Sequence, residues 1–310
     1  MKRFFVVLAA LGLSAAVASA QDFNAAVDAF NAGAQAMETN KTEALAQFRS
    51  ALEQAQACTE AEAPEFVAKC KNAIVGALLS IAKEQINEDA YDEALATLAE
   101  AKTTAAEYEE AEAAQEAATL IPNVYMRKGA TQLKAKDAAG AAATFKELVA
   151  LNPEDGQANL LLGQALMQSG NMGGAIESLT KANELGEANA AKLLGTAYLR
   201  EGQAFLKAGK NNEAVEALEK SNSFNETGNA YKLMASAYTK AGKSAKAIET
   251  YKKYLTLEPK AKDAADIMFT IAATAQKAGD KATAIEYYKK LSGNAKYAAQ
   301  ATQQLGALQK

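Results

Sequence analysis

The sequence predicts an all-helical protein, built as an array of about seven helix-turn-helix units with a capping helix at the C-terminal end. The composition is rich in Ala, Leu, Glu, Lys and Gln, which favours helix throughout the chain. Apolar residues recur three or four positions apart, and no alternating run typical of a β-strand is long enough to matter. Residues 229–259 show the unit most clearly, because two short amphipathic helices flank an Ala-Gly turn. Neither helix can bury its apolar face alone, so the unit needs neighbours of the same kind.

The first twenty residues have a different character from the rest of the chain. A basic start precedes an apolar run over residues 4–17, and small residues occupy positions 18–20. This pattern predicts a signal peptide, residues 1–20, that is cleaved before Gln21. A membrane anchor is the alternative, but the run is shorter than the roughly 20 apolar residues that cross a bilayer. We expect an exported bacterial protein in the periplasm, at the outer membrane or outside the cell, with no integral membrane span after cleavage.

Charge and residue usage exclude several functional classes. The net charge of −4 is spread over interspersed residues of both signs, so no nucleic-acid partner is predicted. The chain contains no histidine, which excludes the common catalytic triads and zinc-binding helices. No glycine-rich phosphate loop follows a strand. We therefore predict a protein that is not an enzyme and has no cofactor or metal. A carboxylate pair acting as acid and base is the remaining enzymatic alternative.

Cys58 and Cys70 are the two cysteines of the chain, and they are a disulfide candidate because the protein is predicted to be exported. Cys58 follows one predicted helix and Cys70 lies early in the next. A bridge would join two antiparallel neighbours and contribute about 3 kcal/mol by the chain-entropy argument. The alternative is a pair of thiols buried at helix contacts.

Residues 21–120 form a predicted N-terminal part with irregular units. Helices are expected over residues 23–37, 42–57, 65–87 and 91–102. The acidic, alanine-rich stretch 103–119 predicts a solvated helix or helical spacer that joins this part to the rest. Pro122 is placed where a new helix would start. We therefore expect a second part, residues 121–310, that holds a regular array and a capping helix over residues 295–309.

Five regular units follow one spacing rule. A small residue in the first helix is followed twelve residues later by an alanine and four residues after that by a large residue. The five sets are Gly129, Ala141 and Phe145; Gly163, Ala175 and Leu179; Gly202, Ala214 and Leu218; Ala235, Ala247 and Tyr251; and Ala272, Ala284 and Tyr288. The turn of each unit carries, in order, Lys136, Gly170, Gly209, Gly242 and Gly279.

This pattern resembles the tetratricopeptide repeat, a helix-turn-helix unit of about 34 residues. The resemblance covers nearly all of the chain after residue 20, although the N-terminal units around Ala44 and Ala94 match less closely. It departs from the family where a tryptophan often begins the unit, because Tyr125, Tyr198 and Tyr231 stand there. The resemblance implies a right-handed α-solenoid in which the small residues let paired helices approach closely.

The resemblance also implies that the first helices line a concave groove, where a peptide or helix of a partner protein docks. Mapping that face onto the sequence gives the candidate groove residues Met126, Leu133, Leu160, Gln164, Met167, Leu199, Gln203, Leu206, Lys232, Phe269 and Gln276. The alternative is that several of these residues form ordinary core between repeats.

Four lysines at the ends of first helices form a candidate basic rim: Lys134, Lys207, Lys240 and Lys277. A rim of this kind would attract an acidic segment of a partner. The alternative is that each lysine complements the dipole of its own helix. The carboxylate clamp of the family, which holds peptide C-termini, is not expected, because Leu160 and Leu199 occupy two of its basic places.

The predicted function is that of a non-enzymatic protein-protein interaction scaffold of the bacterial cell envelope. Its predicted partner is another envelope or secreted protein with an acidic segment. One alternative is a structural protein that assembles into a homo-oligomer. Another is a protein that binds cell-wall glycan or surface polysaccharide through an aromatic platform, for which Tyr287, Tyr288 and Tyr297 are the candidates.

Overall fold

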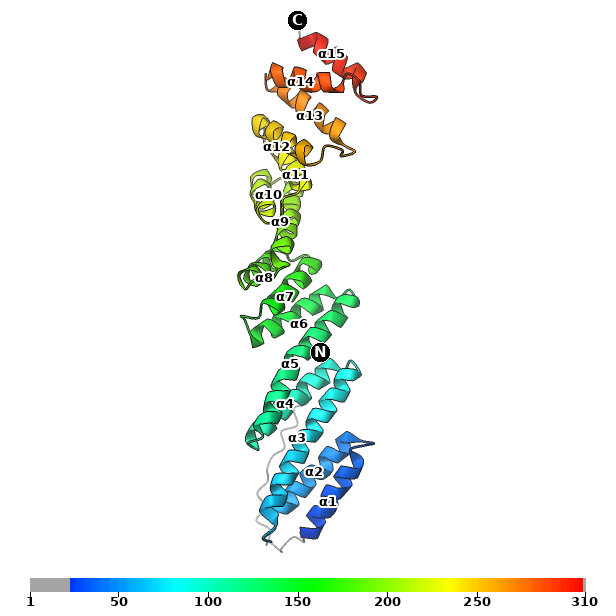
Figure 1. Ribbon diagram of the computed structural model, residues 1–310, viewed down its shortest axis with the longest axis vertical. Helices are drawn as coiled ribbons and strands as arrows, with labels where there is room; N and C mark the ends of the chain where they lie inside the picture. Colours follow the sequence, from blue (N-terminus) through cyan, green and yellow to red (C-terminus); the bar gives the residue numbers. More distant parts are fainter. Residues whose placement is uncertain (1–22, 309–310) are drawn as a thin grey trace. The chain divides into compact units, whose positions relative to one another are not determined.

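The computed structural model describes residues 23–308, so the predicted signal peptide lies outside the described residues. Over that range the chain forms fifteen α-helices and no strand, which confirms the predicted all-helical class (Figure 1). None of the described helices is both long enough and apolar enough to cross a membrane. The chain divides into two compact units, and the boundary between them falls between Val124 and Tyr125.

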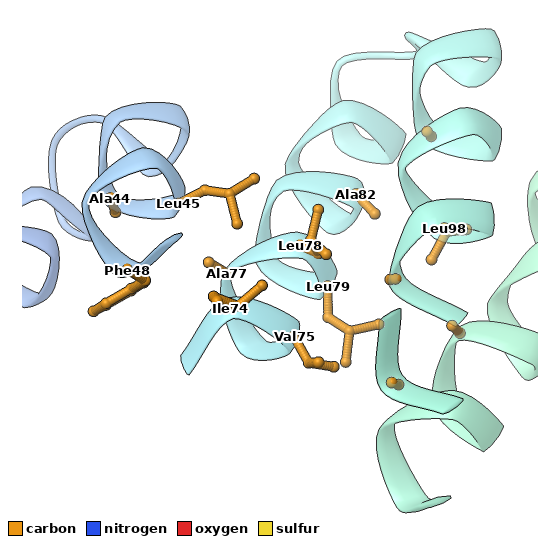
Figure 2. Close-up of a cluster of buried hydrophobic side chains, with 14 of the residues drawn as sticks. Ala44, Leu45, Phe48, Ile74, Val75, Ala77, Leu78, Leu79, Ala82 and Leu98 are labelled. Atoms are coloured by element: carbon orange, nitrogen blue, oxygen red, sulfur yellow. The ribbon is translucent and has the colours of Figure 1, made fainter. Parts of the chain in front are cut away.

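The N-terminal unit is built from helices that pack in sequence order. They are α1 (Phe23–Ala36), α2 (Lys41–Gln56), α3 (Ala63–Asn87), α4 (Tyr91–Glu107) and the first part of α5 (Ala111–Lys134). Helix α3 packs against α2 and against α4. Ile74 and Ala77 of α3 face α2, while Leu79 and Ala82 face α4 (Figure 2). Two apolar faces on one helix explain why α3 is buried along both sides.

The acidic stretch 103–119 is not a solvated spacer, and this prediction was wrong. Helix α4 ends at Glu107, a turn follows, and α5 begins at Ala111. Ala105 and Ala117 are fully buried, so one side of each helix packs against the core while the carboxylates face outward. Pro122 lies inside α5 rather than at the start of a helix. The expected boundary at residue 121 therefore falls within a continuous helix.

Cys58 lies just after α2 and Cys70 lies within α3, and the disulfide between them stays a prediction. The Cys58 Sγ donates a hydrogen bond to the Gln54 carbonyl of its own helix end, at 3.2 Å. Cys70 is fully buried in α3, and this burial raises the pKa of its thiol to about 11. Cys70 is therefore a core residue, while Cys58 is only partly buried.

The C-terminal unit continues the pattern of paired helices. Its helices after α5 are α6 (Ala138–Leu151), α7 (Gly156–Ser169), α8 (Met172–Glu184), α9 (Ala190–Lys207), α10 (Asn211–Phe224), α11 (Gly228–Lys240), α12 (Ser244–Leu257), α13 (Ala264–Lys277), α14 (Lys281–Leu291) and α15 (Ala298–Leu308). Each first helix from α7 onward packs against the second helix that follows it (Figure 1). The first helices α7 and α9, and likewise α9 and α11, also contact each other.

The predicted pairs of small and large residues are in contact. A Cβ atom built on Gly163 would lie 2.6 Å from Cγ of Leu179, and one on Gly202 would lie 2.6 Å from Cγ of Leu218. Gly129 faces the ring of Phe145 in the same way. The glycines are therefore required by the close approach of the two helices. This confirms the packing rule that the spacing predicted.

All five predicted turn positions adopt the left-handed backbone conformation. Gly170, Gly209, Gly242 and Gly279 have φ between 72° and 88°, and Lys136 has a φ of 64°. Glycine adopts this conformation without steric cost because it has no Cβ. A lysine there costs energy, since its Cβ crowds the following carbonyl oxygen.

Replacing Lys136 with glycine is expected to raise the free energy of unfolding by about 1 kcal/mol, because relief of the left-handed strain exceeds the added entropy of the unfolded chain. Urea unfolding followed by circular dichroism measures this as a higher midpoint with an unchanged slope. Gly170→Ala is the opposite control and should lower the midpoint. A lower midpoint for Lys136→Gly would contradict the expectation.

Candidate functional site

A pocket between two neighbouring first helices brings predicted groove and rim residues together. It has a volume of about 340 Å³. Its lining consists of Gln203, Leu206 and Lys207 from α9 with Leu233, Ser236 and Lys240 from α11. We call this site the α9–α11 pocket.

The local sequence explains why these side chains share one surface. Leu233, Ser236 and Lys240 are three and four residues apart, so they lie on one face of α11. Helices α9 and α11 both end two residues before a left-handed glycine, Gly209 and Gly242, which places the last-turn lysines at matching ends of their helices.

The chemistry of the pocket is a half-buried apolar floor beside two exposed ammonium groups. Leu206 and Leu233 are each partly buried and keep apolar surface at the pocket. Lys207 and Lys240 are exposed, and neither forms an ion pair with another of the described residues. Two cations without internal partners beside an apolar floor suit a ligand that combines carboxylates with an apolar side chain.

Several predicted groove residues belong to the packed interior instead. Leu160 is 5% exposed and Met167 is 6% exposed, and both lie in the core cluster that α7 forms with α8 and α9. Leu199 is half-buried against the neighbouring core, and Gln164 is half-buried on α7. For Leu160 and Met167, the alternative of ordinary core between repeats is therefore correct.

Met126 and Leu133 lie on α5 within the C-terminal unit. Both are half-buried and pack against the core cluster around Phe145 and Leu148. They do not line the α9–α11 pocket.

Lys232 does not line the α9–α11 pocket, because its ammonium is engaged by the start of α13. Its Nζ lies 3.1 Å from Oδ2 of Asp263 and 5.5 Å from the centre of the Tyr254 ring. The Tyr254 hydroxyl donates a 2.5 Å hydrogen bond to Oδ1 of the same carboxylate. That hydroxyl, with the Lys232 ammonium, holds the pKa of Asp263 below its usual range. Burial and the Asp263 carboxylate raise the pKa of Tyr254 to about 12.

Phe269 and Gln276 are covered by the C-terminal end of the chain. The Phe269 ring stacks on Tyr297 with 4.6 Å between the ring centroids. The amide of Gln276 donates to Oε1 of Gln304 at 2.9 Å and accepts from the Tyr288 hydroxyl at 2.8 Å. These two predicted groove residues therefore anchor α14, α15 and the segment between them.

The aromatic residues near the C-terminus do not provide an exposed platform for a glycan. Tyr287 and Tyr288 are buried, and Tyr297 is stacked on Phe269. Packing therefore accounts for all three rings.

The four rim lysines share a local position, and two of them share a pocket. Lys134, Lys207, Lys240 and Lys277 are all exposed in the last turns of their helices. Lys207 and Lys240 line the α9–α11 pocket, whereas Lys134 and Lys277 do not.

Leu233 and Ser236 line the α9–α11 pocket but are not among the candidate groove residues given above. The predicted groove face of α11 contained Lys232, whereas the side chains of α11 that line the pocket are Leu233, Ser236 and Lys240. Successive side chains of an α-helix point about 100° apart around the axis. Leu233 therefore faces the pocket, while its neighbour Lys232 faces the next repeat. The apolar character of Leu233 and its spacing from Lys240 could have identified it.

Comparison with known proteins identifies a known repeat in two segments of the chain. Residues 126–190 and 199–262 match the tetratricopeptide repeat, and these segments include both walls of the α9–α11 pocket. Over these two segments the chain contains tetratricopeptide repeats. No curated protein matched the sequence.

Solved structures similar to this chain include three that are described here. The crystal structure of MamA protein is 26% identical, with 58% of this chain and 94% of that chain covered and a TM-score of 0.41. The crystal structure of YrrB, described as a TPR protein with an unusual peptide-binding site, is 16% identical, with 58% and 91% covered and a TM-score of 0.39. The C-terminal part of a TPR repeat-containing protein from Cytophaga hutchinsonii is 19% identical, with 71% and 81% covered and a TM-score of 0.41.

Proposed function

We propose that this protein is a non-enzymatic scaffold of the bacterial cell envelope, and that its α9–α11 pocket binds a segment of a partner protein carrying both acidic and apolar side chains. The observation that carries the proposal is the pairing of an apolar floor, Leu206 and Leu233, with two lysines that have no partner among the described residues. The signal-peptide pattern of the sequence supports an exported location.

The two parts of the pocket contribute differently to binding. Burial of an apolar side chain against Leu206 and Leu233 supplies most of the affinity, at about 25 cal/mol per Å² of apolar surface removed from water. Contacts between exposed lysines and carboxylates add about 0.2–1 kcal/mol each and weaken as salt rises. Lys207 and Lys240 therefore mainly set the orientation and the association rate of the acidic segment.

The test uses matched charge reversals inside and outside the pocket. The probe is a fluorescent peptide of alternating Asp and Leu residues, followed by anisotropy, with a twin in which Asn replaces Asp. Lys207→Glu with Lys240→Glu is expected to weaken binding at least tenfold, because attraction becomes repulsion. Lys134→Glu with Lys277→Glu makes the same change of net charge away from the pocket and is expected to leave binding unchanged.

Two further measurements complete the test. Leu206→Glu with Leu233→Glu should abolish binding of the acidic peptide while helical circular dichroism is retained. The Asn twin should bind more weakly than the Asp peptide at low salt, and the difference should shrink as salt rises. Equal losses for the two pairs of lysine reversals would reject the pocket as the binding site. Crosslinking in an envelope fraction with the same variants then identifies the natural partner.

A further inference from the structure

A second and larger pocket lies between the second helices α6 and α8, with α7 as its floor. Its volume is about 840 Å³, which is within the range of small-ligand sites. The walls are mainly apolar and include Ala142, Val149, Leu162 and Leu166. We call this site the α6–α8 pocket, and it shares no lining residue with the α9–α11 pocket.

The α6–α8 pocket exists because small residues stand where other units carry large ones. Ala142 follows the inner alanine of its unit, at a position that holds Ile176, Val215, Ile248 and Ile285 in the other regular units. Asn159 precedes the small residue of its first helix by four positions, where the other regular units hold Tyr125, Tyr198, Tyr231 and Met268. Gly174 precedes the inner alanine of α8, where later units hold Glu213, Lys246 and Thr283.

The equivalent place between α10 and α12 is filled by the chain itself. The pocket there has a volume of about 190 Å³. Tyr231 stands in place of Asn159, and Tyr238 stands in place of Leu166. This comparison shows that the packing geometry of the array accepts tyrosine rings at this position, and that α6–α8 lacks them.

Two buried polar groups line the α6–α8 pocket without full hydrogen bonding. Asn159 is 5% exposed, and its amide Nδ2 donates to the carbonyls of Pro153 at 3.0 Å and Asp155 at 2.9 Å. These two bonds fix the amide orientation and leave Oδ1 as an acceptor with no partner among the described residues. Ser178 is 8% exposed, and its hydroxyl also has no hydrogen-bond partner in the described part of the chain. Neither atom is sealed off in the interior, so both are available at the pocket surface to a ligand that can accept and donate hydrogen bonds.

We propose that the α6–α8 pocket binds a tyrosine side chain of a partner polypeptide. The apolar walls take the ring, and the phenol O–H donates to Oδ1 of Asn159 while its oxygen accepts from the hydroxyl of Ser178. Lys146 and Glu177 line the pocket as exposed charges of opposite sign, which suits the polar flanks of a polypeptide. The site lies on the second helices and is separate from the groove of the proposed function.

The experiment titrates N-acetyl-tyrosinamide into the full chain and follows the methyl signals of Ala142 and Leu162 by NMR. Saturable shifts at these methyls are expected, with N-acetyl-leucinamide and N-acetyl-phenylalaninamide at least tenfold weaker because they lack the phenol. Asn159→Tyr, which copies the filled α10–α12 arrangement, is expected to lose binding at least tenfold without a lower melting temperature. Asn212→Tyr, at an exposed site on α10, is the matched control and should bind as the parent does.

Two further variants separate binding in the α6–α8 pocket from misfolding and from binding in the α9–α11 pocket. Ser178→Ala should weaken binding of the tyrosine probe while leaving binding of the phenylalanine probe unchanged, and it applies even if Asn159→Tyr misfolds. Leu206→Glu with Leu233→Glu should leave the tyrosine probe unaffected, so failure of the groove proposal is distinguishable from failure of this one. The proposal is overturned if Asn159→Tyr binds as well as the parent, if all three amides bind equally, or if free phenol binds and N-acetyl-tyrosinamide does not.

Discussion

Replacing Phe145 with alanine is expected to lower the free energy of unfolding by about 3–5 kcal/mol. The side chain is fully buried, and its ring fills the space opposite Gly129 of α5. Removing it takes away both the transfer free energy of the ring and its contacts with the walls of the cavity that remains. Glycine at 129 has no side chain that could move into the vacated space, so relaxation can recover little of the loss.

Urea denaturation of the C-terminal part of the array reports this effect as a shifted midpoint. Leu151→Ala is the matched control on the same helix, because Leu151 is 52% exposed at the end of α6. It should change stability by no more than about 0.5 kcal/mol, as surface substitutions usually do. A Phe145→Ala variant as stable as Leu151→Ala would show that the ring is not part of the core.

Replacing Gly129 with valine is expected to lower the free energy of unfolding by about 1–3 kcal/mol through overpacking. A Cβ at this position would overlap the Phe145 ring, and the ring is enclosed by its own core cluster. The helix propensity of valine is higher than that of glycine, which alone would stabilise α5 slightly. The steric effect is the larger of the two, so the net change is destabilising.

A double-mutant cycle separates these contributions. In the Phe145→Ala background the valine enters the cavity, so Gly129→Val should become neutral or stabilising there. The expected coupling free energy is about 1–3 kcal/mol, within the range found for residues in contact. Strictly additive effects would contradict the contact between this glycine and this ring. The same cycle on Gly76, where an added Cβ would meet nothing within 4 Å, should show no coupling to Phe145.

Much of the fold could be predicted from the sequence because its determinants are local. A glycine that must adopt a left-handed turn, such as Gly170, is recognisable from its position after an amphipathic helix. A small residue opposite a large one, such as Gly163 and Leu179, repeats at a fixed spacing. The unit with Lys136 in place of the turn glycine is still recognisable, because its small and large residues keep the same spacing.

The predictions for Pro122 and for the acidic stretch 103–119 were wrong because tertiary packing overrides these local signals. Pro122 favours a helix start, yet α5 had already begun at Ala111 and continues through it. The acidic stretch looked solvated by composition, but its alanines lie on one buried side. A proline is weak evidence for a helix start, and a run of carboxylates is weak evidence for a solvated helix, when the buried face of the helix is made of alanine.

The candidate site was predicted only in part, because it depends on the rotation of each helix and on contacts distant in the sequence. Lys232 and Leu233 differ by one residue, yet one pairs with Asp263 and the other lines the α9–α11 pocket. Gln276 is covered by Gln304, which is 28 residues away along the chain. Neither helical period nor composition carries that information.

Helix α15 packs against the last pair of repeat helices in the described part of the chain. Each repeat presents an apolar side that the next repeat covers, and α13 and α14 present theirs to α15 and the segment before it. Tyr297 stacks on the Phe269 ring, and Gln304 accepts a hydrogen bond from the Gln276 amide. A further repeat at this position would have to pack against the same two groups. The Phe269 ring and the Gln276 amide are therefore already engaged by side chains from the last described segment of the chain.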